Sequence, residues 1–239
     1  MTSFVTTDQG ARWAPRAVLF DLDGTLADTA PDLGGAVNRM RVRRGLPPLP
    51  LEQLRPVASA GARGMLAVGL GVSPAQADYE ALRDEFLAEY ESALDVDSVL
   101  FDGAAAVLQA LTHAGIAWGV VTNKAMRFTG PVLEGLGLAA TASVVIGGDT
   151  TPHSKPHPAP LLEACRRLQI EPGQALYVGD DLRDMEAARA AGMPAVAAAY
   201  GYLGETPDLT AWRADAVIAH LLQLLPLIGV ELPSDDRGA

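Results

Sequence analysis

Cysteine and lysine are both scarce in this chain of 239 residues. Cys165 is the single cysteine, so a disulfide within the chain is excluded and we expect a reducing, cytoplasmic setting. The opening sequence MTSFVTTDQGARWAPR lacks the apolar core of a secretory signal, in agreement with that expectation. Lys124 and Lys155 are the only lysines, and arginine supplies the remaining positive charge. Each lysine is therefore a candidate for a function rather than an ordinary surface cation.

Positive charge and aromatic side chains are also in short supply. Lysine and arginine number 18 against 29 acidic residues, which gives a formal net charge of -11 and a pI near 4.7. Aromatic residues make up 5% of the chain. We expect no nucleic-acid partner, because recognition of nucleic acid is favoured by the opposite charge and by rings on which bases can stack. Apolar residues at 49% and charged residues at 20% predict a folded protein.

One uncharged run, residues 103–123, has the length of a membrane span. Gln109, Thr112 and Gly115 interrupt it, so it is better explained by a helix over 104–113, a glycine turn and a buried strand. The sequence therefore predicts no membrane partner, and it leaves the oligomeric state open.

Short apolar runs separated by helix-compatible sequence predict the fold class. Such alternation is typical of an α/β protein, with a Rossmann-like parallel sheet flanked by helices. The expected strands are Ala17–Phe20, Ile116–Val121, Val144–Ile146, Ala175–Val178, Ala195–Ala198 and Ala216–Ile218.

The stretch between the first two expected strands is too long for one crossover helix, so it must hold an insertion. It shows helical spacing and no strand pattern, and we expect an all-helical cap over residues 31–99. The core would then be discontinuous, formed by residues 1–30 and 100–239. Helices are expected at Pro31–Arg44 and Leu51–Leu70.

A third cap helix is expected to begin at Ser73. Ser73, Pro74 and Gln76 have the order of an N-cap, a first-turn proline and a capping-box partner. Apolar residues follow at helical spacing, at Tyr79, Leu82, Phe86, Leu87, Tyr90 and Leu94.

Two aspartates follow the first expected strand. Asp21 and Asp23 lie where open α/β sheets bind ligands, and Gly24 and Thr25 predict a turn that lets both carboxylates approach one site. A hairpin is disfavoured because helical sequence follows. A calcium loop of the EF-hand type is excluded, since its required glycine and glutamate positions hold Leu26 and Asp32. Ordinary solvated loop acids remain the alternative.

Four motifs in order make the chain resemble the haloacid dehalogenase superfamily. The first is DLDGT, with Asp21 and Asp23, and the second is the strand end VVTNK, with Thr122 and Asn123. The third is Lys155 in SKPHPAP, and the fourth is GDDLRD, with Asp180 and Asp184. The resemblance spans residues 17–202.

This resemblance implies a Mg²⁺-dependent phosphatase acting on a small phosphorylated metabolite. Asp21 would be the nucleophile that forms an aspartyl-phosphate, and Asp23 the general acid and base. The resemblance assigns the metal to the side chains of Asp21 and Asp180 and the backbone carbonyl of Asp23. Asp184 would orient these ligands, and Asp181 could touch a metal-bound water. Thr122, Asn123 and Lys155 would hold the phosphoryl oxygens.

Several reactions remain open within this resemblance. Asp23 argues against dehalogenation, and the absence of lysine from residues 30–100 argues against phosphonate cleavage, which needs a Schiff base. The chain looks most like phosphoglycolate phosphatases, and next most like N-acetylmuramic acid 6-phosphate phosphatases. A phosphosugar mutase and a non-catalytic binding module are further alternatives.

Arg63, in the glycine-flanked segment SAGARGM, is the expected cap residue for substrate binding. Both leading substrates carry a carboxylate, which a guanidinium can bind with two hydrogen bonds. We therefore expect the room left by the cap to decide between them.

Overall fold

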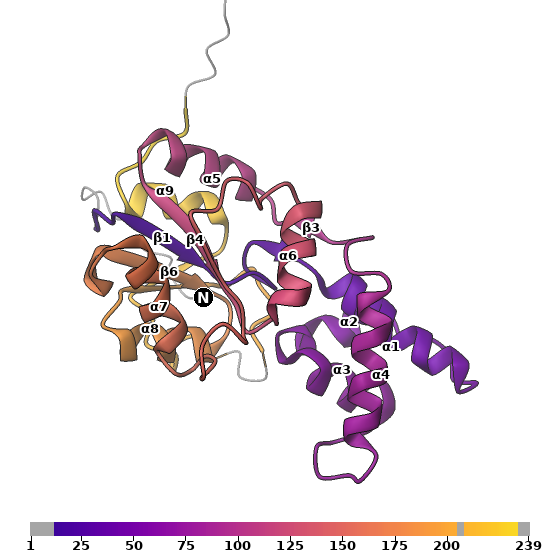
Figure 1. The fold of residues 1–239 in the computed structure, drawn as a ribbon. Helices are drawn as coiled ribbons and strands as arrows, with labels where there is room; N and C mark the ends of the chain where they lie inside the picture. Colours follow the sequence, from indigo (N-terminus) through magenta and orange to yellow (C-terminus); the bar gives the residue numbers. More distant parts are fainter. Residues whose placement is uncertain (1–11, 205–207, 234–239) are drawn as a thin grey trace, which may run out of the picture.

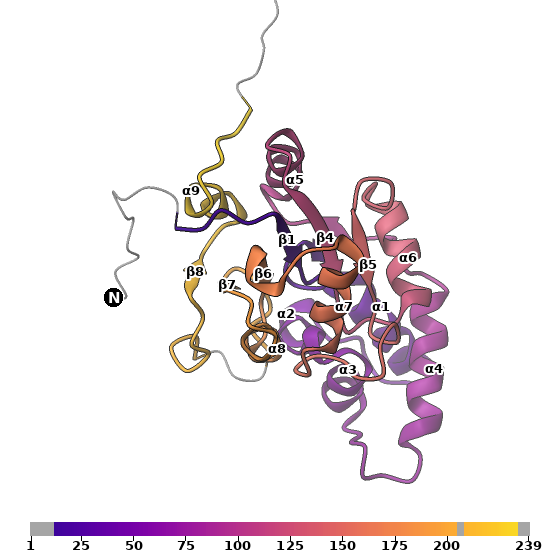
Figure 2. The same cartoon turned by 60° about the vertical axis from the view of Figure 1, so that its left-hand side comes forward.

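The computed structural model describes residues 12–204 and 208–233, and a six-stranded parallel sheet forms its centre (Figures 1 and 2). The strand order is β5-β4-β1-β6-β7-β8. The bounds are β1 Ala17–Phe20, β4 Ala117–Val121, β5 Val144–Ile146, β6 Ala175–Gly179, β7 Ala195–Ala198 and β8 Ala216–Ile218. The predicted fold class is confirmed, with β4 one residue shorter and β6 one residue longer than expected.

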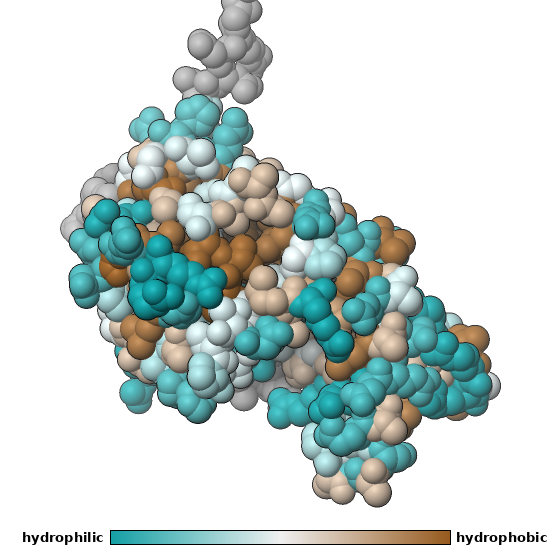
Figure 3. All heavy atoms as spheres, in the orientation of Figure 1, coloured by the Kyte–Doolittle hydropathy of each residue, from teal (hydrophilic) through white to brown (hydrophobic). Residues whose placement is uncertain are grey.

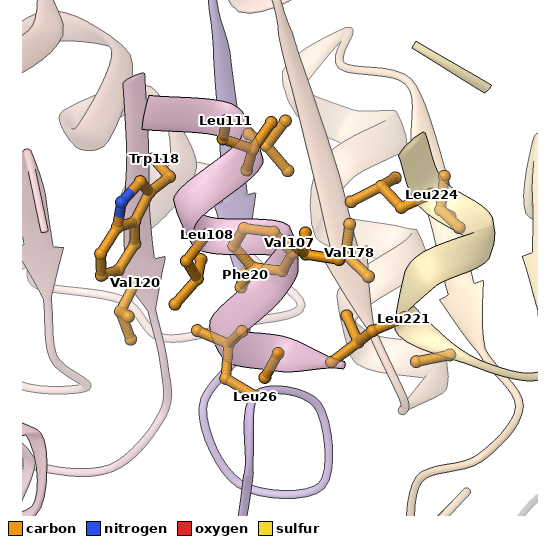
Figure 4. Packing of buried hydrophobic residues seen from close by; sticks show 14 of the residues in the cluster. Phe20, Leu26, Val107, Leu108, Leu111, Trp118, Val120, Val178, Leu221 and Leu224 are labelled. Carbon is orange, nitrogen blue, oxygen red and sulfur yellow. The ribbon is translucent and has the colours of Figure 1, made fainter. Parts of the chain in front are cut away.

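Alternating residues of β1 face two separate layers of the core. Val18 and Phe20 join the cluster that packs under α5 (Ala104–His113) and α9 (Leu224–Leu227), which Figure 4 shows from close by. Ala17 and Leu19 join the cluster under α7 (Ala159–Leu168) and α8 (Leu182–Ala191). All four are fully buried, as expected for a central strand with helices on both faces. The helices of these layers are α5 Ala104–His113, α6 Met126–Gly135, α7 Ala159–Leu168, α8 Leu182–Ala191 and α9 Leu224–Leu227, with 3₁₀ turns at Pro172–Gln174 and Leu221–Gln223.

A helical insertion lies beside the sheet domain, between β1 and α5 (Figure 1). It contains α1 Ala30–Arg43, α2 Leu51–Leu54, the 3₁₀ helix η1 Arg55–Ala60, α3 Gly61–Leu70 and α4 Tyr79–Glu91. The chain leaves and re-enters the core through two short antiparallel strands, β2 Ala27–Asp28 and β3 Val99–Leu100. An all-helical insertion is thus confirmed, while its proposed limits at residues 31 and 99 remain a prediction.

Most of the surface of the insertion is hydrophilic on the face drawn in Figure 3. Ion pairs between α4 and the C-terminal end of α1 contribute to this surface. Arg43 lies 2.5 Å from Glu89, and Arg44 lies 2.5 Å from Glu85. The apolar sides of the same helices form a third cluster that includes Met40, Phe86 and Tyr90. Phe128 and Tyr202 of the sheet domain belong to the same cluster, so this core joins the insertion to the sheet domain.

Two expectations about the insertion are wrong in detail. The expected helix Leu51–Leu70 is broken into α2, η1 and α3, with Pro56 at the start of η1 and Gly61 at a positive φ of 56°. The third helix begins at Tyr79 instead of Ser73. The Gln76 side chain does accept the Ser73 backbone N–H at 2.6 Å, but this bond closes a local turn, and the helix starts only after that turn.

Within residues 12–204 and 208–233, no helix has the length and apolar character needed to cross a membrane. The uncharged run 103–123 forms α5, a turn and β4, as expected.

Candidate active site

The carboxyl ends of three adjacent strands bring the expected motifs together. Asp21 follows β1, Thr122 follows β4 and Asp180 follows β6, and these strands are neighbours in the sheet. Oxygen atoms from Asp21, Asp180 and Asp184 lie within 4.8 Å of one another, and all three side chains are buried. Parallel topology therefore gathers residues that are far apart in the sequence.

Lys155 is the cation at the centre of this carboxylate cluster. Its Nζ lies 3.0 Å from Asp21 Oδ1 and 2.7 Å from Asp184 Oδ1, and its side chain is 2% exposed. Nζ also donates to the Tyr177 hydroxyl at 2.8 Å and to the Val121 carbonyl at 3.1 Å. These acceptors fix the ammonium group beside Asp21, and the pKa of Lys155 is raised by Asp184 and Asp21 in spite of burial.

Negative charge exceeds positive charge within the buried cluster. Burial, opposed by Lys155 and reinforced by Asp184, raises the pKa of Asp21 to about 7. Burial, with Asp21 and Asp184 nearby, also raises the pKa of Asp180 well above its usual range. A buried oxygen-rich site with surplus negative charge is what a hard divalent cation requires, so the residues present fit Mg²⁺.

Asp180 is held in place by the turn that follows β1 and by the loop after β7. Its Oδ1 accepts the Thr25 hydroxyl at 2.9 Å, and its Oδ2 accepts the Tyr202 backbone N–H at 2.8 Å. Gly24 has a φ of 87°, and a Cβ at this position would collide with the Asp180 carboxylate. The glycine is needed both for the turn and for the close approach of the two segments.

Asp184 has both carboxylate oxygens engaged by other protein groups. Oδ1 binds Lys155 and lies 3.3 Å from the Tyr177 hydroxyl, and Oδ2 accepts the Asp181 backbone N–H at 3.1 Å. A carboxylate held in this way is suited to orienting its neighbours.

Asp181 lies at the start of α8 and is committed to a different partner. Its side chain accepts the Arg183 backbone N–H at 2.9 Å and pairs with the Arg183 guanidinium at 2.8 Å. Hydrogen bonds from Arg183 hold the pKa of Asp181 below its usual range despite burial. The expected contact of Asp181 with a metal-bound water remains a prediction, but these contacts favour a role as a helix cap.

Asp23 contacts a hydroxyl and a lysine. Its Oδ1 accepts the Thr29 hydroxyl at 2.5 Å and lies 3.0 Å from Lys124 Nζ. Asp23 also lines a cavity with Asp21, so the backbone turn at Gly24 brings both carboxylates to one site, as the sequence predicted.

Thr122 and Asn123 line the same cavity. The Thr122 hydroxyl accepts the Lys124 backbone N–H at 3.2 Å. The Asn123 side chain accepts the Lys155 N–H at 2.9 Å and donates to the Lys155 carbonyl at 3.0 Å. Asn123 thereby fixes the loop that carries Lys155, a contact that the strand-end motif alone does not reveal.

The cavity has a volume of about 390 Å³ and lies between the sheet domain and the insertion. Leu33, Phe86, Leu87 and Phe128 give it apolar walls. Its cationic residues are Arg63, Lys124, Arg127, Lys155 and Arg183. An anionic ligand with an organic part larger than a few atoms fits this combination.

Arg63 lies on α3 and lines the cavity, with an exposed side chain. The expectation that the insertion directs an arginine toward the core site agrees with this position, and substrate contact remains a prediction. Arg183 was not expected: it reaches from the core and donates to the Ser59 carbonyl of η1 at 2.8 Å.

Cys165 belongs to the core instead of the site. It is buried in α7 against the cluster that includes Leu161, and burial raises the pKa of its thiol to about 11. This environment fits packing and excludes a reactive thiolate.

The fold and the site define an α/β core with a buried group of carboxylates at the strand ends and a helical insertion beside it. Residues 18–198 match the model of the haloacid dehalogenase-like hydrolases. The chain therefore belongs to this family of enzymes, as its motifs indicated.

Two groups of relatives cover most of the chain. A protein of Xanthomonas campestris named phosphoglycolate phosphatase is 51% identical over 210 residues, which cover 88% of this chain and 95% of that protein. A protein of Pseudomonas aeruginosa named N-acetylmuramic acid 6-phosphate phosphatase is 43% identical over 213 residues, covering 89% and 94%. A solved superfamily hydrolase of Geobacter sulfurreducens has a TM-score of 0.70 at 27% identity, covering 94% of this chain and all of that one.

Proposed function

We propose that this protein is a Mg²⁺-dependent phosphomonoesterase that works through an aspartyl-phosphate on Asp21. The observation that carries the proposal is the buried group of Asp21, Asp180 and Lys155, in which Asp21 and Lys155 line the cavity together with Asp23. Phosphate monoesters hydrolyse very slowly without a catalyst, and this group combines a nucleophile with charge neutralisation.

The side chains of Asp21 and Asp180 and the backbone carbonyl of Asp23 would hold Mg²⁺. When bound, the ion would offset the repulsion between the carboxylates and the phosphoryl group. Asp184 lies behind these ligands, and its engaged oxygens support an orienting role.

The remaining steps use the protein's own groups. The phosphoryl oxygens would be bound by Thr122, the Asn123 backbone N–H and Lys155. Asp21 attacks phosphorus, and Asp23 donates a proton to the departing oxygen. Asp23 then accepts a proton from the water that hydrolyses the aspartyl-phosphate.

Two substrates carry both a phosphate and a carboxylate and appear in the names of relatives, 2-phosphoglycolate and N-acetylmuramic acid 6-phosphate. The higher identity supports the first. The cavity supports the second, because about 390 Å³ with apolar walls falls in the size range of sites for drug-sized ligands. A two-carbon acid would leave most of this volume to water. By this criterion the amino-sugar phosphate is the favoured substrate, and 2-phosphoglycolate is the alternative.

The test is a comparison of kcat/KM for these two compounds, with and without Mg²⁺. We expect the amino-sugar phosphate to have the higher value and both activities to need the ion. Exclusion of the amino sugar together with efficient hydrolysis of 2-phosphoglycolate would reverse the assignment. Turnover only with an added bisphosphate would indicate a phosphosugar mutase, and no turnover of any phosphomonoester would indicate a binding module.

Arg63→Ala is expected to raise KM for carboxylate-bearing substrates about tenfold and to leave nitrophenyl phosphate nearly unchanged. Only the carboxylate-bearing substrates lose a charge-assisted pair, and at the exposed Arg63 this pair is worth the low end of roughly 1.5–3 kcal/mol. Steady-state kinetics on both substrate types provide the measurement. An equal loss on both would point to packing or phosphate binding, and no loss on either would remove Arg63 from the site.

A further inference from the structure

Lys124 is a second buried lysine, and the catalytic scheme above leaves it without a role. Lys124 comes directly after Thr122 and Asn123 at the end of β4, and its side chain is 7% exposed. Burial disfavours a charged ammonium, but Asp23 and Tyr90 raise the pKa of Lys124.

Lys124 and Thr29 both bind the same oxygen of Asp23. The Lys124 ammonium lies 3.0 Å from Oδ1, and the Thr29 hydroxyl donates to Oδ1 at 2.5 Å. Among the described residues, Oδ2 of Asp23 has no hydrogen-bond partner. This arrangement fixes the carboxyl group by one oxygen and leaves the other available to a substrate in the cavity.

The insertion holds Lys124 through Tyr90. Lys124 Nζ donates to the Tyr90 hydroxyl at 2.8 Å and lies 4.6 Å from the centre of its ring. Tyr90 is 1% exposed, and Phe128 packs edge-on against it at 5.6 Å. Because α4 supplies Tyr90 and the sheet domain supplies Asp23, Lys124 connects the two parts of the molecule at the reacting group.

We propose that Lys124, fixed by Tyr90, is a positioning residue that presents Oδ2 of Asp23 to the leaving-group oxygen of the substrate. The inference rests on the proposed phosphatase function and extends it to a residue outside that scheme. Without the ammonium, Asp23 keeps only the Thr29 contact and can rotate away from the leaving group. An error of about 1 Å in the placement of such a group can cost about 10² in rate.

The leaving group provides a test that a purely structural role would fail. An alkoxide is strongly basic and needs a proton as it departs, whereas nitrophenolate is a weak base and needs little help. The value of kcat/KM covers the steps up to formation of the aspartyl-phosphate, so it isolates this proton transfer from later hydrolysis.

The experiment compares Lys124→Met with the unaltered protein on nitrophenyl phosphate and on the alkyl phosphomonoester with the highest kcat/KM. We expect a loss of about 10² on the alkyl substrate and of about threefold or less on nitrophenyl phosphate. Tyr90→Phe keeps the ring and removes the hydroxyl, so it should shift the ratio in the same direction by a smaller factor. Arg39→Met is the matched control, because it removes a cation that pairs with Glu89 of α4 at 3.1 Å and does not line the cavity. It should leave the ratio unchanged.

Two other results with Lys124→Met would contradict the inference. Equal losses on both substrates in Lys124→Met would mean a role in binding or folding, and no loss on either would make Lys124 a spectator. If Lys124→Met fails to fold, an unchanged ratio in Tyr90→Phe contradicts the proposal by itself. Failure of the unaltered protein to hydrolyse either substrate would refute the proposed function instead.

Discussion

Asp21→Asn should abolish turnover, lowering kcat below about 10⁻³ of the unaltered value. An amide oxygen is a poor nucleophile and cannot form the aspartyl-phosphate, so covalent catalysis is lost as a whole. The fold should survive, because asparagine has nearly the same shape and can still accept the Leu22 N–H that Oδ1 accepts at 2.8 Å. The measurements are steady-state kinetics, together with intact mass after acid quenching to detect a phosphoryl group on the protein.

Asp23→Asn is the matched control for this experiment. It lies two residues away on the same turn and should lower kcat/KM by about 10² to 10⁴ on alkyl substrates. Asp21 is intact in this variant, so a nitrophenyl substrate should still phosphorylate it. Activity above a few per cent in Asp21→Asn, or a phosphorylated Asp21→Asn protein, would show that another residue is the nucleophile.

Residues at strand ends could be predicted from the sequence because a local pattern defines them. Asp21, Thr122 and Asp180 each end a short apolar run, and parallel topology sends such ends to one edge of a sheet. The inserted helices were predictable for a similar reason, since apolar spacing marks a helix. Fold class and the core of the site therefore followed from patterns within single segments.

Contacts between distant segments could not be predicted in this way. In the sequence Tyr90 is one more apolar position of a helix, and no residue near it in the sequence indicates that its hydroxyl binds Lys124. Arg183 likewise reads as a surface residue of α8, although it reaches the Ser59 carbonyl. The scarcity of lysine was the one available signal, and it pointed to Lys124 without giving its partners.

Local signals also failed where two structures compete for the same residues. Ser73 and Gln76 satisfy the sequence pattern of a capping box, but their bond closes a turn that ends before Tyr79. The apolar face of α4 packs from Tyr79 onward, where Tyr79, Phe86 and Tyr90 are buried. Tertiary packing thus sets the start of this helix.

Removal of Mg²⁺ should eliminate activity and lower the melting temperature, by an amount that grows with pH. In the metal-free protein, burial raises the pKa of Asp21 from 3.8 to about 7. A carboxyl group whose pKa is higher in the folded than in the unfolded protein stabilises the fold at pH values below its unfolded-state pKa. This contribution is lost as the pH rises from about 4 through 7. Mg²⁺ binds the ionised carboxylates and offsets the loss. At a free concentration about a hundredfold above Kd it should add about 2.7 kcal/mol, which corresponds to roughly 5–10 °C.

The measurement is a thermal melt at pH 5 and pH 8, each with Mg²⁺ and with a chelator, on the unaltered protein and on two isosteric variants. Asp180→Asn should lose most of the Mg²⁺-dependent shift at pH 8, because a charged ligand that is fully buried becomes a neutral one. Asp184→Asn should keep more of it, since both oxygens of Asp184 already bind Lys155 and the Asp181 N–H. If both variants lost the Mg²⁺-dependent shift of the melting temperature equally, Asp184 would also be a metal ligand. A shift of the same size at both pH values, or full activity in the chelator, would contradict a metal site built from Asp21 and Asp180.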